Sequence, residues 1–65
     1  MVKFPQVKVD LIGKDGNAFA ILSAVTRAMM SVGVSKEDIT NYRNEAMSGD
    51  YDNLLAVTME TVNVN

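Results

Sequence analysis

The feature that most limits this chain is its shortness: it has 65 residues and no cysteine. A domain of this size removes only about 60% of its unfolded surface from water when it folds. No disulfide is available to add stability, so the gain from apolar burial and the loss of chain entropy nearly cancel. We therefore expect residues 1–65 to form a single domain. We also expect a homodimer, because a second copy buries apolar surface that the monomer leaves in water.

The composition also limits which reactions, ligands and partners the chain can have. The chain has no histidine, which removes the most common general base and transition-metal ligand. Its formal net charge is −2 with only six basic residues, so a phosphate backbone would meet few cations and nucleic acid is an unfavourable partner. No apolar run is long enough to cross a membrane, and Met1 is not followed by a signal-peptide pattern. We expect a cytoplasmic protein that is not an enzyme and uses no cofactor.

Two stretches near the ends of the chain have the pattern of β-strands. The stretch VKVDLI, residues 7–12, alternates apolar and polar side chains, which predicts a strand with one apolar face. Pro5 lacks a backbone N–H for a strand ladder, so the strand is expected to begin after it. Near the other end, Val62 and Val64 alternate with asparagines, which predicts a short last strand. The alternation leaves open whether the two strands pair parallel or antiparallel.

The first helix is expected from about Ala18 to Val32. It follows GKDGN, residues 13–17, a glycine-rich turn that ends in Asn17 as a plausible N-cap. An anion site in this turn is the alternative, although Asp15 would repel a phosphate. Apolar side chains occupy about half of the helix circumference, which is wider than the ~100° stripe of a surface helix. Such a helix is central to the fold or is covered by a second subunit.

Two further helices are indicated by capping signals. Ser35 and Asp38 form an S-x-x-D capping pair, which predicts that the second helix starts at Lys36. Gly49 is placed to end that helix in a left-handed C-cap, and Asp50 directly after it is placed to cap the third helix. The predicted fold is therefore α+β, with three helices between short N- and C-terminal strands that pair into a small sheet. The apolar face of that sheet is expected to lie on the first helix.

Several side chains admit a functional interpretation beside a structural one. Asp50 and Asp52 have the oxygens that a hard cation binds, but DYDNLLAVTME places leucines where calcium ligands would be needed. We therefore favour a cap at Asp50 and expect no metal. Tyr42 and Tyr51 are interpreted as partly buried tyrosines with a solvated hydroxyl. Apolar residues that suit either a core or an adaptable interface are Phe19, Met29, Met30, Met47 and Met59.

The segments GKDGNA and EAMSGDYDNLL resemble those of a group of small uncharacterised proteins from bacteria and their phages. That group has a G-x-D-G-N-A segment and a later E-A-x-S-G-D-Y-D-x-L-L segment, and the similarity covers about Val9 to Val64. The resemblance implies an intact domain with an accessory role. The group has no assigned activity, so the resemblance transfers no catalytic or binding residue.

Three functional hypotheses follow from the sequence. The first is a protein-interaction module that forms a homodimer and binds another protein. The second is nucleic-acid binding by a dimer that gathers Lys3, Lys8 and Lys14 from both chains. The third is a metal-dependent enzyme that uses Asp50 or Asp52. The apolar width of the first helix and the number of methionines favour the first hypothesis.

Overall fold

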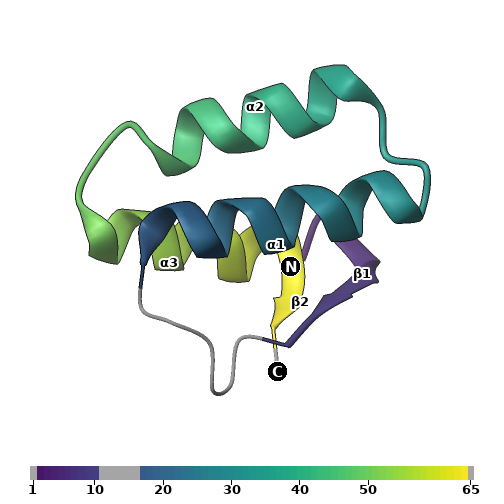
Figure 1. Cartoon of the computed structure of the whole chain (residues 1–65), viewed down its shortest axis with the longest axis horizontal. Helices are drawn as coiled ribbons and strands as arrows, with labels where there is room; N and C mark the ends of the chain where they lie inside the picture. Colours follow the sequence, from purple (N-terminus) through teal and green to yellow (C-terminus); the bar gives the residue numbers. More distant parts are fainter. Residues whose placement is uncertain (1, 11–16, 65) are drawn as a thin grey trace.

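A computed structural model describes residues 2–10 and 17–64 of the chain. The predicted fold class is correct. Along the chain, three helices follow the first strand and precede the second, and the two short strands pair into a sheet (Figure 1). The predictions for Leu11, Ile12 and the glycine-rich turn at residues 13–16 lie outside the described residues. The elements in order are β1 (Phe4–Val9), α1 (Ala18–Ser31), α2 (Lys36–Ala46), α3 (Tyr51–Thr61) and β2 (Val62–Val64).

The two strands pair in parallel, which settles the direction that the sequence left open. β1 begins at Phe4, so the prediction that it starts after Pro5 is wrong. In this two-stranded sheet β1 has one neighbour, and the missing N–H of Pro5 is tolerated on an edge strand. The carbonyl oxygen of Pro5 still contributes, because it accepts a hydrogen bond from Asn63 Nδ2 at 2.6 Å. The pairing joins Phe4 to Val62 and Val9 to Val64, with an irregularity between Phe4 and Lys8.

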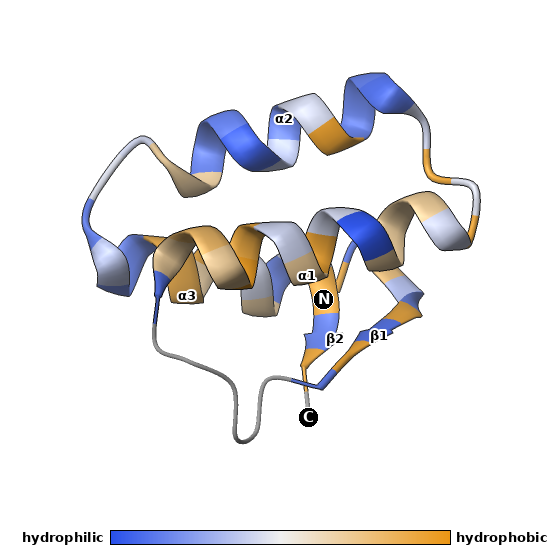
Figure 2. Cartoon of the chain, viewed as in Figure 1, coloured by the Kyte–Doolittle hydropathy of each residue, from blue (hydrophilic) through white to orange (hydrophobic). Residues whose placement is uncertain are grey.

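The core lies between one face of the sheet and the helices. Val7, Val9 and Val62 are buried on that face, which agrees with the predicted apolar surface of the sheet. Figure 2 shows that α1 and α3 carry much of the apolar sequence, whereas α2 is mostly hydrophilic. The buried apolar residues contributed by the helices are Ile21, Leu22, Val25, Met29, Tyr42, Ala46, Leu54 and Val57.

Tyr42 departs from its prediction. It is buried, but its hydroxyl is not solvated: it shares a hydrogen bond of 2.7 Å with Thr58 Oγ1, and Thr58 is fully buried. Desolvation by burial raises the pKa of the Tyr42 hydroxyl, and the bond to Thr58 opposes that shift. The bond joins α2 to α3 and satisfies two polar atoms that would otherwise be buried without a partner.

The predicted N-caps at Asn17, Ser35 and Asp50 agree with the structure, whereas Asp38 contributes its backbone N–H to the cap of α2. In each case a side-chain oxygen accepts a hydrogen bond from a backbone N–H of the first helical turn, as capping requires. Asp52 lies in the first turn of α3, where a negative charge faces the positive end of the helix dipole. The bonds run from Phe19 N to Asn17 Oδ1 at 2.8 Å, from Asp38 N to Ser35 Oγ at 3.2 Å, and from Asn53 N to Asp50 Oδ1 at 2.9 Å.

Gly33, rather than Gly49, provides the left-handed C-cap. Gly33 follows α1 with φ of 83°, and Val34 N donates to Met29 O at 3.0 Å while Gly33 N donates to Met30 O at 3.1 Å. These two bonds are the pattern of a Schellman motif. Among the described residues, Gly33 is the glycine with positive φ, so the prediction of a left-handed cap at Gly49 is wrong.

Gly49 has a steric role at the turn between α2 and α3. A Cβ atom at this position would lie 3.0 Å from Asn53 Cβ and 3.1 Å from Asn53 Cγ. The close approach lets Asn53 Nδ2 donate to the carbonyl oxygens of Glu45, at 3.1 Å, and Ala46, at 3.4 Å. A side chain in the first turn of α3 therefore bonds carbonyl groups in the last turn of α2, and the carbonyl oxygen of Glu45 also accepts from Ser48 Oγ at 2.7 Å.

Candidate functional site

Large apolar side chains remain exposed on α1, on α3 and at the C-cap of α2. Phe19 and Met30 of α1 are 70% and 65% exposed, and Met47 at the end of α2 is 54% exposed. Met29 is fully buried, so of the two roles expected for it the structure gives it the core role. Adjacent helical residues point about 100° apart, which explains why Met29 faces the core while Met30 faces solvent. The full set of exposed large apolar residues is Phe19, Met30, Val32, Met47, Tyr51 and Met59.

Three depressions follow the seam between α1 and α2. The first holds about 210 Å³ and is lined by Phe19 and Met47, where the start of α3 also reaches it. The second, of about 130 Å³, shares Phe19 with the first and includes Thr26 and Arg43. The third, of about 410 Å³, includes Met30. Because these depressions follow one another along the same two helices, we call them together the α1–α2 groove.

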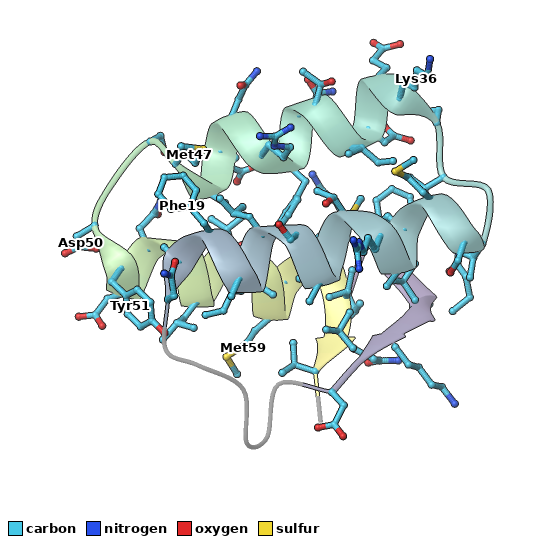
Figure 3. All side chains as sticks on the ribbon, in the orientation of Figure 1. Phe19, Lys36, Met47, Asp50, Tyr51 and Met59 are labelled. Carbon is cyan, nitrogen blue, oxygen red and sulfur yellow. The ribbon has the colours of Figure 1, made fainter. Side chains whose placement is uncertain are left out.

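Each wall of the groove is one flank of a helix. The side chains of each flank repeat at i, i+4, i+7 and i+11, which keeps them on the same side of a helix. Figure 3 shows Phe19 and Met47 together at one end of the seam, with Lys36 on the far end of α2. The α1 wall consists of Phe19, Ser23, Thr26 and Met30, and the α2 wall consists of Lys36, Thr40, Arg43 and Met47.

Charge is divided between the two flanks of α2. Lys36 and Arg43 are the cations of this helix, and both lie on the groove wall. Asp38 and Glu45 lie on the other flank, where they line a small cleft with Phe4 of β1. The groove therefore combines apolar ends with a basic α2 wall, and the carboxylate of Asp50 lies at the Phe19 end.

A second apolar surface lies on α3. Tyr51, Leu55 and Met59 follow one another at i, i+4 and i+8, and Leu55 is partly buried while the other two are exposed. Figure 3 shows Tyr51 and Met59 below α1, away from α2. Asp52 and Glu60 each follow a member of this row and are exposed. We call these five residues the α3 flank; Tyr51 also lines the first depression of the groove.

The remaining candidate residues are used structurally or stand apart. Asp50 Oδ1 accepts the Asn53 N–H as a helix cap. Within residues 2–10 and 17–64, no group of three or more metal-ligating side chains is found. Lys3 and Lys8 are exposed at β1, and Lys14 lies outside the described residues. No helix in the described part of the chain is long and apolar enough to span a membrane.

Comparisons with protein-family models, curated proteins and solved structures find no match to this chain. The functional inference therefore depends on the arrangement of its own residues. Sequence reasoning found Phe19, Met30 and Met47 but missed the hydroxyl and basic members of the groove walls. A signal was present in the sequence: Lys36, Arg43 and Met47 are spaced at i, i+7 and i+11, which places them on the same side of a helix.

Proposed function

We propose that this chain is a small cytoplasmic protein-interaction module that works as a homo-oligomer and uses the α1–α2 groove as its binding surface. As the sequence resemblance implies, we assign it an accessory role in a bacterium or a phage. The observation that supports this proposal is that Phe19, Met30 and Met47 are all more than half exposed and all line depressions along the seam between α1 and α2.

The chemistry of the groove suits a protein partner. Exposed apolar patches with polar rims are typical of interaction surfaces, and methionine adapts its shape to different partners. A groove between two helices accepts the apolar face of an amphipathic helix. Thr26 and Thr40 lie between the apolar ends, and their hydroxyl groups can pair with polar atoms of that helix.

Site-specific photocrosslinking tests this proposal. A benzophenone amino acid replaces Phe19 in one variant and Met47 in another, and the proteins are irradiated in the cytoplasm of the native host. The control places the same group at Ala20, which is exposed on α1 and lines none of the three depressions. We expect discrete protein adducts from the two groove positions and none from the control. The absence of adducts at both groove positions, or equal adducts at Ala20, would contradict the proposal.

Nucleic-acid binding is the competing hypothesis, supported by the exposed Lys3 and Lys8. A titration with random-sequence DNA and RNA at two salt concentrations separates it from protein binding, since binding to phosphates weakens steeply as salt rises. We expect no salt-dependent complex. A complex that Lys3→Ala and Lys8→Ala abolish would favour the competing hypothesis.

A further inference from the structure

We infer that the occupant of the α1–α2 groove is the α3 flank of a second copy of this chain. This inference rests on the proposed function, because it names the partner of the same groove. It is supported by complementary charge, by matching length, and by the apolar residues that such a contact would cover.

The charges of the two surfaces are opposite and similarly spaced. Lys36 and Arg43 are seven residues apart on the groove wall, which corresponds to about 10.5 Å along a helix. Asp52 and Glu60 are eight residues apart on α3, which corresponds to about 12 Å. Within the described part of the chain, none of these four side chains has an ion-pair partner. Opposite charges with matched spacing set register and suppress wrong partners at an interface.

The apolar parts of the two surfaces also match in length. Tyr51 to Met59 spans about 12 Å along α3, and Phe19 to Met30 spans about 16.5 Å along the groove, so the row fits within the groove. A contact with other copies that covers both surfaces would remove five exposed apolar side chains from water: Phe19, Met30, Met47, Tyr51 and Met59. Only Val32 would then remain of the exposed large apolar residues in the described ranges. An unrelated partner in the groove would leave Met59 in water.

The two surfaces share Tyr51, but the charged residues chosen for substitution each belong to one surface, so the contact can be tested by complementation. The groove variant carries Lys36→Glu and Arg43→Glu, and keeps an acidic α3 flank. The flank variant carries Asp52→Lys and Glu60→Lys, and keeps a basic groove. Each variant places like charges opposite each other in its own self-contact, whereas the mixed pair places opposite charges together in every contact.

Sedimentation velocity over a range of protein concentrations measures the association of the wild type, of each variant and of their mixture. We expect the wild type to self-associate, and we expect each variant alone to associate at least about tenfold more weakly. An equimolar mixture should restore association, with a complex that contains both chains. A control with Glu37→Lys and Glu45→Lys makes the same charge change as the flank variant, outside both surfaces. It also places one substitution in the first turn of a helix, as Asp52→Lys does, and it should associate like the wild type.

Three outcomes would overturn the inference: a monomeric wild type, a mixture that associates no better than its components, or a control that loses association as the flank variant does. Circular dichroism shows whether each variant is folded, so a loss of association is not mistaken for unfolding. If crosslinking from Phe19 captures a different protein while the mixture fails, the proposed function stands with another partner. If crosslinking captures nothing, the proposed function itself fails.

Discussion

The buried bond between Tyr42 and Thr58 allows a quantitative test of the packing of α2 against α3. The two hydroxyl groups lie 2.7 Å apart, and Thr58 is fully buried. Tyr42→Phe removes one partner and leaves the Thr58 hydroxyl in the core without it, which should lower the free energy of unfolding by about 1–3 kcal/mol. Thr58→Val leaves the Tyr42 hydroxyl without its partner and should cost a similar amount.

The double variant separates a lost hydrogen bond from lost packing. It removes both polar atoms while nearly keeping the shape of the core, and such a replacement is close to neutral. We therefore expect the double variant to be no less stable than either single variant, so the coupling free energy should be at least about 1–3 kcal/mol, the cost of one single variant. The assay is urea unfolding of all four proteins at one fixed protein concentration, because an oligomer's stability depends on concentration. Additive single and double effects would contradict this prediction, since they would show that the two hydroxyls do not stabilise each other.

Three further predictions use the same assay. Asp50→Ala should lower stability by about 0.5–2 kcal/mol and Asp50→Asn much less, because asparagine keeps the capping oxygen; a more stable alanine variant would contradict the cap. Gly49→Ala should destabilise by about 1 kcal/mol, because the new Cβ displaces the Asn53 amide from two carbonyl oxygens; a gain in stability would show that the contact is unimportant. Burial raises the pKa of Tyr42 in the folded state. The contribution of the neutral Tyr42 hydroxyl to the free energy of unfolding is therefore constant below about pH 10. It is lost above that pH, because the tyrosine ionises first in the unfolded chain. Tyr42→Phe should flatten this alkaline decline, and an unchanged decline would assign it to other groups.

The parts of the fold that sequence predicts well are set by local interactions. Asn17, Ser35 and Asp50 cap helices through bonds that span two or three residues, so the signal is contained in a short stretch. Gly49 is an exception, because its role depends on Asn53 of the next helix. A glycine that follows a helix looks the same in sequence whether it provides positive φ or a close approach.

The groove and the buried bond depend on how whole helices are placed. The Tyr42 hydroxyl finds Thr58 sixteen residues away, and no periodicity within α2 indicates that partner. Met29 and Met30 both belong to the apolar half of the α1 circumference, which is wider than one contact surface needs. The apolar pattern alone could therefore not show which of the two is buried. The parallel direction of the strands likewise follows from the path of three helices between them.

The most direct test of the α1–α2 groove as a binding surface is a dilution series of methyl spectra with ¹³C-labelled methionine. Met30 and Met47 line the groove, Met59 lies on the α3 flank, and Met29 is fully buried and serves as the control. We expect the methyl signals of Met30, Met47 and Met59 to shift together as concentration rises, while that of Met29 stays in place. Signals from Met30 and Met47 that do not move at any concentration, in a protein that nevertheless self-associates, would contradict it.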